Sequence, residues 1–310
     1  MKAGIKKTLK RVIRFGRLSN FSSGGFMNPL NLRELIVNFL NEDLGITGDW
    51  SSLPLKGRRV RGALIAKEDF VLCGAPFFEE VFRVLDAGAS FRWKFKEGEE
   101  VKEGQVVGEV LSDAGALLSA ERTALNLLQR LSGIATNTRS YAEVLRGSPV
   151  KLLDTRKTTP GLRVFEKYAT RVGGAVNHRF GLFDAVMVKD NHIKAYGGVE
   201  RAVRAVREVI PATMKVEVEV ESWQELQEAL KVIELIDLIM LDNWKEEEVE
   251  EAVKLIRERD GRVKVELSGG ITRERLKKVR ELPVDFVSTS RLITAAKWVD
   301  ISLEVEFEHP

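Results

Sequence analysis

The sequence predicts a mixed α/β protein whose second half is a parallel βα barrel. Between residues 150 and 290 short apolar runs recur, and each one ends in polar or charged residues. The residues that mark these ends are Asp154, Lys189, Glu219, Asp242, Ser268 and Ser288. The gaps between the markers hold helical patterns, such as Val199, Ala202, Val203 and Val206. Strands that alternate with helices at this spacing are typical of parallel βα units.

The polar strand ends favour a barrel over an open sheet. In a βα barrel the carboxyl ends of all strands face one mouth, where active sites lie. An open doubly wound sheet, which is the alternative, would gather its polar residues mainly at one switch point. No Gly-x-Gly-x-x-Gly motif follows an early strand, so a dinucleotide-binding fold has no support. We therefore expect the marked strand ends to share one site.

The first half is predicted to hold a helix, a strand-rich segment and a long helix, in that order. Apolar residues recur at helical spacing over residues 31–44, and Gly45 ends this pattern. Strands are expected in short runs at residues 61–66, 70–73 and 91–95, and in two further short runs around Val101 and Val106-Val107. A second helical pattern extends from Ser119 to about Arg146.

Composition narrows the class of protein. The chain has 310 residues, and at about 150 residues per domain this predicts roughly two domains. Lys and Arg (49) nearly balance Asp and Glu (46), which argues against general affinity for nucleic acids. One cysteine excludes an intramolecular disulfide and a cysteine-based metal cage. No run approaches the ~18 apolar residues of a membrane-spanning helix. We expect a protein of a reducing compartment, the cytoplasm.

Residues 1–26 differ from the rest of the chain. No acidic residue precedes Glu34, and the basic segment becomes rich in serine and glycine before Met27. A transit peptide has this Arg-rich, acid-poor composition. A disordered extension, or a start codon placed too early, is the simpler interpretation. We therefore leave this segment out of the prediction of the fold.

The predicted mouth gathers cations, carboxylates and loops of small residues. Its cations are Arg156, Lys157, Arg179 and Lys189, with His178 beside them; its carboxylates are Glu219 and Asp242; its loops are Ser268-Gly269-Gly270 and Thr289-Ser290. Backbone N–H groups of such loops bind phosphate, and the cations suit further anionic groups. The carboxylates suit ribose hydroxyls or a hydrated Mg²⁺. A phosphorylated sugar and a multiply anionic co-substrate would satisfy all three groups.

Each of these features also has a purely structural interpretation. Glu219 could form an ion pair with Lys189, His178 could be a hydrogen-bonded structural histidine, and Gly269-Gly270 could be a tight turn. Glu217 shares strand parity with Glu219, so spacing alone does not separate these two carboxylates. The joint occurrence on one predicted face favours a functional site.

Several long motifs resemble the quinolinate phosphoribosyltransferase family. They comprise residues 120–126, 129–136, 154–163, 177–182, 188–192, 217–220, 241–243 and 268–271, with Glu42-Asp43-Leu44-Gly45 and Gly48-Asp49 near the front. The resemblance spans about residues 27–306. The chain departs from the pattern at Gly173-Gly174-Ala175-Val176, where many relatives carry three glycines, and at Ser288-Thr289-Ser290, where many have Val-Gly-Ala. Thr47 looks inserted before Gly48.

The resemblance implies a fold and a reaction. The expected fold is an amino-terminal α/β sandwich domain over residues 27–132, followed by an incomplete parallel βα (TIM-like) barrel over 133–295. Residues 296–310 are expected to pack back on the amino-terminal domain. The expected enzyme transfers phosphoribosyl from phosphoribosyl pyrophosphate to quinolinate, with decarboxylation, in NAD biosynthesis. It would require Mg²⁺ and work as a homodimer or a hexamer of dimers.

The resemblance also implies roles for individual residues. Substrate binding is expected at Arg122, Thr155, Arg156, Lys157, His178, Arg179, Lys189, Ser268, Gly269, Gly270, Thr289, Ser290 and Arg291. Catalysis is expected at Lys157, Lys189, Glu219 and Asp242. The two acidic residues would also hold Mg²⁺, directly or through water, and Arg122 would reach into the neighbouring subunit's site.

Two rival interpretations remain. One is a relative with another substrate, such as the molybdenum-associated homologue or a nicotinate-using phosphoribosyltransferase. Arg122, Arg156 and Arg179 together favour a dicarboxylate over nicotinate, which has one carboxylate. The other rival is a phosphosugar-binding protein without activity. The acidic pair Glu219 and Asp242 argues against it, because a binder has less need of charges directed at a transition state.

Overall fold

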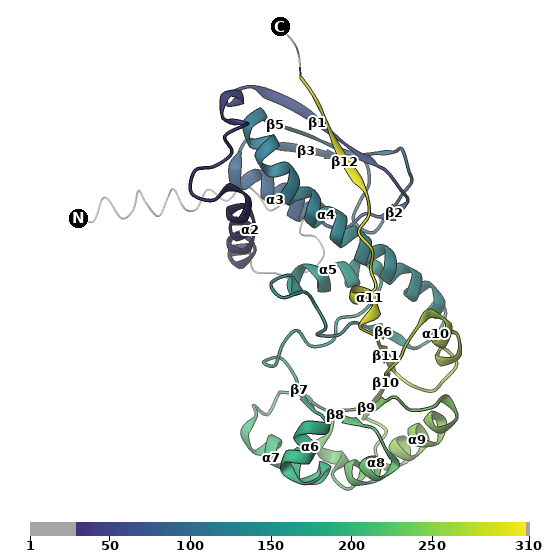
Figure 1. Cartoon of the computed structure of the whole chain (residues 1–310). Helices are drawn as coiled ribbons and strands as arrows, with labels where there is room; N and C mark the ends of the chain where they lie inside the picture. The colour runs from purple at the N-terminus through teal and green to yellow at the C-terminus, as the bar shows by residue number, and fades with distance from the viewer. Residues whose placement is uncertain (1–28, 308–310) are drawn as a thin grey trace, which may run out of the picture.

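The computed structural model describes residues 29–307, and the basic extension at residues 1–26 lies outside this part. An antiparallel sheet with its helices forms one unit and a parallel βα unit forms the other (Figure 1). The mixed α/β class that the sequence predicts is thereby confirmed. Within residues 29–307 no helix combines the length and the apolar character needed to cross a membrane.

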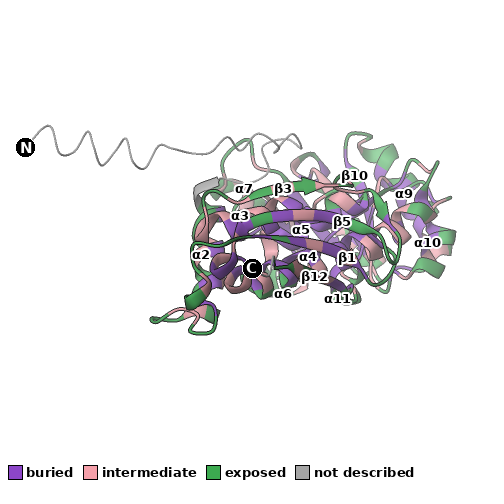
Figure 2. Ribbon diagram, turned by 90° about the horizontal axis from the view of Figure 1, so that it is seen from above, coloured by how far each residue is buried: buried purple, intermediate pink, exposed green. Residues whose placement is uncertain are grey.

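The amino-terminal sheet has four strands in the order β12-β1-β5-β3. Their bounds are Arg59–Ala66 for β1, Ser90–Trp93 for β3, Val106–Asp113 for β5 and Ile301–Glu306 for β12; β2 (Phe70–Val71) and β4 (Glu100–Val101) form a separate pair. Buried and more exposed residues alternate along β1 (Figure 2), as expected where one face of an antiparallel sheet covers a core. β12 pairs with β1, so the end of the described chain lies beside the first strand.

Three helices accompany this sheet: α2 (Pro29–Leu44), α3 (Ala75–Leu85) and α4 (Ala114–Ala142). The Asp113 side chain accepts a hydrogen bond from the backbone N–H of Ala116 and caps α4. The helix thus begins at Ala114 and not at the expected Ser119. The sequence-based start was too late because Ala114 and Leu117, which are buried in the core, precede the stretch with the clear helical period.

The parallel sheet has six strands in the order β6-β11-β10-β9-β8-β7. Their bounds are Lys151–Leu153 for β6, Val186–Val188 for β7, Val216–Val220 for β8, Leu238–Asp242 for β9, Lys264–Ser268 for β10 and Phe286–Ser288 for β11. The consecutive strands β6 and β7 form the two edges, and the pairings of the described residues do not join them. The βα barrel is therefore incomplete, with its opening between β6 and β7 (Figure 1).

Helices alternate with these strands. They are α5 (Arg163–Gly173), α6 (Asp190–Tyr196), α7 (Val199–Val209), α8 (Trp223–Leu230), α9 (Glu246–Arg259), α10 (Arg273–Val279) and α11 (Arg291–Thr294), with 3₁₀ turns at Leu53–Leu55, Glu143–Leu145 and Ile233–Leu235. Apolar residues of α7 to α10 and of the strands form one buried core. Ser222 and Thr272 cap α8 and α10 by accepting backbone N–H groups.

The two units meet where the carboxyl-terminal segment crosses α4. A Cβ atom at Gly133 would lie 1.9 Å from the carbonyl oxygen of Lys297, so only glycine permits this approach. The side chain of Gln129, one turn earlier, donates to the carbonyl of Ile301 over 2.9 Å. These contacts lead the chain from the barrel back to the amino-terminal sheet.

Candidate active site

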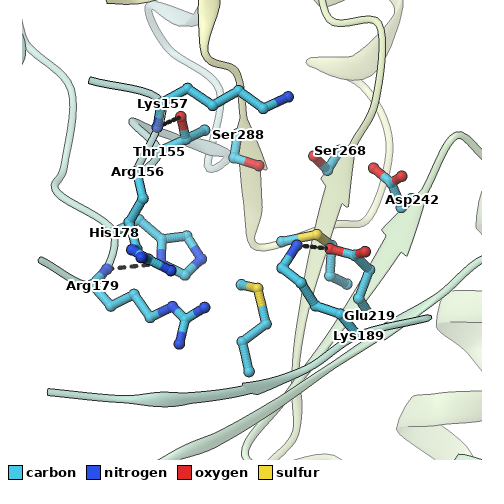
Figure 3. A pocket seen from close by; sticks show the side chains of 12 residues that line it. Thr155, Arg156, Lys157, His178, Arg179, Lys189, Glu219, Asp242, Ser268 and Ser288 are labelled. Carbon is cyan, nitrogen blue, oxygen red and sulfur yellow. Dashed lines mark hydrogen bonds and ion pairs between the residues drawn. The ribbon is translucent and has the colours of Figure 1, made fainter. Parts of the chain in front are cut away.

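A pocket of about 480 Å³ opens at the carboxyl end of the parallel sheet (Figure 3). It is lined by Thr155, Arg156, Lys157, His178, Arg179, Met187, Lys189, Glu219, Met240, Asp242, Ser268 and Ser288. Every strand of the sheet supplies a lining residue from its carboxyl end or from the loop that follows it. The marked strand ends therefore meet at one mouth.

The pocket contains most of the residues expected from the sequence, and it excludes some. Arg122, Gly269, Gly270, Thr289, Ser290 and Arg291 are not among its lining residues. Arg122 is exposed on α4. Sequence reasoning missed Met187 and Met240, which stand two residues before Lys189 and Asp242 and so share their face of the strand. Strand parity could have found both methionines.

Arg156 and Arg179 form a cationic wall, and neither has an ion-pair partner among the described residues. The Nε of Arg156 is buried and has no hydrogen-bond partner among the described residues. Arg179 donates from Nη1 to the carbonyl of Ala185 over 3.0 Å. Burial, together with the neighbouring Arg156, lowers the pKa of Arg179. A buried N–H group without a partner is costly. The wall, with this free donor and two adjacent positive charges, is therefore suited to an anionic ligand.

The opposite wall carries carboxylates. The Nζ of Lys189 lies 2.5 Å from the Oε2 of Glu219, which is the ion pair of the structural interpretation. Asp242 accepts from the side-chain amide of Asn243 over 2.7 Å. Oxygens of Glu219, Glu221 and Asp242 lie within 4.8 Å of one another. This all-oxygen set fits a hard cation such as Mg²⁺.

Sequence reasoning also missed Glu221, the third member of this acidic set. It follows β8 and keeps the parity of Glu219, which is the signal that could have identified it. Burial raises the pKa of Glu221, and the nearby carboxylates of Asp242 and Glu225 raise it further. The side chain therefore lies in a field of negative charge that a cation would relieve.

His178 contacts two buried carboxylates behind the pocket wall. Its Nε2 lies 3.1 Å from the Oε2 of Glu217 and 3.4 Å from the Oε2 of Glu266. The structure thus distinguishes the two glutamates that strand parity could not separate. Glu219 lines the pocket, whereas Glu217 faces His178.

In the cluster of His178, Glu217 and Glu266, burial and the neighbouring charges shift the pKa values of His178 and Glu217. Burial opposes the charged imidazole, but the facing carboxylates outweigh it and raise the pKa of His178 to about 10. Burial and the charge of Glu266 raise the pKa of Glu217 to about 7. The backbone N–H of Arg179 lies 2.7 Å from the Nδ1 of His178, so the Nε2 side of the ring is the one that faces the two carboxylates.

The small-residue loops follow β10 and β11. Gly269 has φ +86°, and a Cβ there would lie 2.2 Å from the Oδ1 of Asn243. This glycine thus meets the structural requirement of a tight turn beside Asp242. The hydroxyl of Thr289 donates to the carbonyl of Ile271 over 3.0 Å, which ties the two loops together. Ser268 at the end of β10 and Ser288 at the end of β11 direct their side chains into the pocket (Figure 3).

Comparison with known protein families matches both units of the chain. The sequence model described as quinolinate phosphoribosyl transferase, N-terminal domain, matches residues 49–132. The corresponding C-terminal domain matches residues 134–304.

Individual proteins show the same likeness. A probable nicotinate-nucleotide pyrophosphorylase (carboxylating) from Synechocystis sp. is 44% identical over 272 residues, which cover 87% of this chain and 91% of the relative. The human nicotinate-nucleotide pyrophosphorylase (carboxylating) is 41% identical over 281 residues, 89% of this chain and 92% of the relative. The crystal structure of NadC from Streptococcus pyogenes superposes with a TM-score of 0.83 and 40% identity, covering 91% of this chain and 99% of that chain.

Proposed function

Because the chain belongs to the quinolinate phosphoribosyltransferase family, we propose that its pocket transfers phosphoribosyl from phosphoribosyl pyrophosphate to quinolinate. The products would be nicotinate mononucleotide, pyrophosphate and CO₂, in NAD biosynthesis. The observation that supports this site assignment most directly is the cationic wall of Arg156 and Arg179, in which the Nε of Arg156 has no partner among the described residues. This wall faces the carboxylates of Glu219 and Asp242 across one pocket (Figure 3).

The cationic wall would hold quinolinate. Two guanidinium groups can bind two carboxylates with charge-assisted hydrogen bonds, and the free Nε–H of Arg156 supplies one donor. Holding both carboxylates fixes the rotation of the pyridine ring and directs its nitrogen at C1 of the ribose. Nicotinate, with one carboxylate, would satisfy only part of this wall.

The acidic wall would act on the ribose. Departure of pyrophosphate builds positive charge at C1, which the carboxylates of Glu219 and Asp242 stabilise electrostatically. Lys157 and Lys189 offset the negative charge of the leaving group. The nitrogen–C1 bond makes the pyridine cationic, so the ring retains the electron pair when the adjacent carboxylate departs as CO₂. The vacated ring carbon then takes a proton, and the chemistry needs no organic cofactor.

Glu219, Asp242 and Glu221 are proposed to hold Mg²⁺, directly or through water. Bound Mg²⁺ would neutralise charge on the phosphate oxygens of the substrate. The test is removal of divalent cations with a chelator. We expect activity to disappear and to return on addition of Mg²⁺. Full activity in the presence of excess chelator would contradict this assignment.

Arg122 is proposed to complete the site of a second copy of the chain. It is exposed on α4 and does not line the pocket of its own chain. The test mixes the inactive Arg122→Ala and Lys189→Ala variants of the homodimer, whether it stands alone or is the unit of a hexamer. In a mixed dimer one site would combine an intact Lys189 with the intact Arg122 of the other chain. Random pairing predicts about a quarter of wild-type activity after mixing. A mixture as inactive as its components would contradict this arrangement.

We place the enzyme in the cytoplasm. Its sole cysteine, Cys73, is buried and free, which suits a reducing compartment. Fractionation of cells that produce a tagged chain tests this: we expect recovery with a cytosolic marker enzyme, and recovery with an organelle or membrane fraction would contradict it.

One assay tests the reaction. The chain is incubated with phosphoribosyl pyrophosphate, Mg²⁺ and carboxyl-labelled quinolinate or nicotinate. We expect CO₂ and nicotinate mononucleotide from quinolinate, and no turnover of nicotinate. Turnover of nicotinate alone would identify the substrate as a monocarboxylate. Binding of phosphoribosyl pyrophosphate without turnover of either acid would favour a phosphosugar-binding protein.

A further inference from the structure

Helix α5 connects the amino-terminal domain with the two loops that carry the cationic wall. It follows the loop with Arg156 and Lys157 and precedes the loop with His178 and Arg179. Three of its residues, Phe165, Tyr168 and Ala169, are nevertheless buried in the core of the amino-terminal domain. The Phe165 ring packs edge-on against Phe77 at a centroid distance of 4.9 Å. The helix is therefore fixed to a body outside the barrel.

Glu166 anchors the first loop. Its side chain is fully buried and accepts both the backbone N–H (2.8 Å) and the hydroxyl (2.9 Å) of Thr159. It also accepts hydrogen bonds from the Nη2 and the Nε of Arg130, over 2.9 and 3.2 Å. Arg130 lies on α4 and also donates to the carbonyl of Ala296. The loop after Lys157 is thus tied, through one carboxylate, to the long helix of the other domain.

Lys167, the next residue, anchors the second loop. It is fully buried, and its Nζ lies 2.5 Å from Asp154 Oδ1 and 3.0 Å from the carbonyl oxygen of His178. Asp154 in turn accepts the backbone N–H of His178 over 2.8 Å. Lys167 and Asp154 therefore hold the polypeptide on both sides of the His178 side chain.

Arg163 links the two loops directly. Its Nε donates to the hydroxyl of Thr158 over 3.0 Å and its Nη1 to the carbonyl of Phe180 over 3.1 Å. None of Arg163, Glu166 and Lys167 lines the pocket. Buried ion pairs add little to stability compared with apolar replacements. Packing of α5 alone therefore does not explain why two successive positions carry buried charges.

We propose that Glu166 and Lys167 are positioning residues that set the spacing between Arg156 and Arg179, and hence the recognition of two carboxylates on one substrate. Each residue holds one cation-bearing loop, and both are fixed to the same helix. The inference rests on the proposed function, because it takes quinolinate as the ligand of the cationic wall.

The test measures quinolinate affinity separately from turnover. In the double variant Glu166→Leu/Arg130→Met both charges are removed, so no unpaired charge remains buried, but Thr159 loses its anchor. We expect a KM for quinolinate at least tenfold above wild type, a KM for phosphoribosyl pyrophosphate within about threefold, and a smaller change in kcat. Glu166→Gln keeps an acceptor for Thr159, so we expect it to recover most of the quinolinate affinity.

Thr159→Val provides a second test of the same anchor if the Glu166→Leu/Arg130→Met variant does not fold. Thr159 is exposed, and this variant removes only the hydroxyl part of the anchor, so we expect a severalfold increase in KM for quinolinate. Glu80→Gln is the matched control, because Glu80 is a buried carboxylate paired with Arg33 over 2.7 Å on helices α3 and α2. It should lower the melting temperature without changing either KM.

Lys167→Met/Asp154→Asn tests the second anchor in the same way. Its quinolinate KM should rise, whereas kcat should change less. Wild-type quinolinate affinity in the folded Glu166→Leu/Arg130→Met variant or in Thr159→Val would overturn the proposal. Absence of quinolinate turnover in the wild-type chain would instead overturn the proposed function, so the two failures are distinguishable.

Discussion

Arg179 and Lys189 stand on opposite walls of the pocket and differ in what surrounds their charges. Arg179 lies next to another guanidinium group and is oriented by a backbone carbonyl. Lys189 is already paired with Glu219 at 2.5 Å. An anion can therefore bind at Arg179 without displacing a carboxylate, whereas at Lys189 it competes with Glu219. The two residues should consequently affect different kinetic constants.

Alanine variants of these residues test that difference. We expect Arg179→Ala to act mainly through the KM for quinolinate and Lys189→Ala mainly through kcat. Each should lower kcat/KM by about 10²–10³-fold, because a charged partner of the substrate is removed. The measurement is steady-state kinetics with each substrate varied in turn. Lys194→Ala, on the exposed face of α6, is the control. Wild-type turnover in either pocket variant would contradict the assignment.

At the scale of residues, the sequence predicts most of the side chains that form the pocket, but it does not predict which residues they contact. The cations and carboxylates follow apolar runs, so the strand period places them at one mouth. The same period assigns Glu217 and Glu219 to one face and cannot show that Glu217 contacts His178. The unpaired Nε of Arg156 depends on what surrounds it in three dimensions, and a linear sequence does not show that environment.

At the scale of elements, Gly269 shows that a loop predicted to bind phosphate also has a steric need for glycine. A Cβ atom at this position would clash with Asn243, which is next to Asp242. We expect Gly269→Ala to cost about 1–3 kcal/mol of folding free energy for a left-handed backbone and to lower kcat by more than tenfold. Gly147→Ala has a comparable φ, +81°, with open space around it, and is the matched control. It should lower stability and leave kcat unchanged.

Asp86, at the end of α3, ties that helix to two strands. It accepts the backbone N–H of Asp113 and the hydroxyl of Ser112 on β5, and pairs with Arg59 of β1 at 2.7 Å. Burial alone would raise the pKa of Asp86, but these donors outweigh it and lower the pKa. A lowered pKa contributes stability above the unfolded value of about 3.9 and loses it as pH falls through the folded value.

The Asp86→Asn variant should reveal this dependence. At pH 7 we expect it to unfold at a clearly lower denaturant concentration than wild type. As the pH falls from about 4 through the lowered pKa of the folded state, the wild-type carboxylate becomes neutral as well, and the difference should shrink. Denaturant titrations from pH 7 to pH 2.5 measure it. A difference that stays constant over this range would show that charge on Asp86 does not stabilise the fold.

The order of the elements could be predicted better than their ends. The alternation of apolar runs and helical patterns predicts the six parallel strands, because each run must be buried on both faces. The start of α4 was misplaced, since Ala114 and Leu117 are buried by contacts with distant segments. The passage of the carboxyl-terminal segment over Gly133 is likewise a long-range contact, with the carbonyl of Lys297. No local pattern records such contacts.

At the scale of the whole molecule, the cores do not follow the boundary between the sheets. Helix α5 lies between two strands of the barrel, yet its Phe165 is fully buried with residues of the amino-terminal domain. Ile293 of α11, the helix after the last strand of the parallel sheet, belongs to the same core. Loss of either unit would therefore expose apolar surface of the other, and this predicts that the two units unfold together.

Paired core variants test this cooperativity. Phe165→Ala removes a ring that contacts Phe77 and Phe39, and Leu276→Ala truncates a fully buried residue of α10 in the barrel core. We expect losses of about 3–5 kcal/mol and 2–5 kcal/mol, respectively, from truncation in a packed core. Scanning calorimetry at fixed protein concentration should show one transition, and both variants should shift it to lower temperature. Two transitions, each moved by only one of the variants, would mean that the domains unfold independently despite the shared helix.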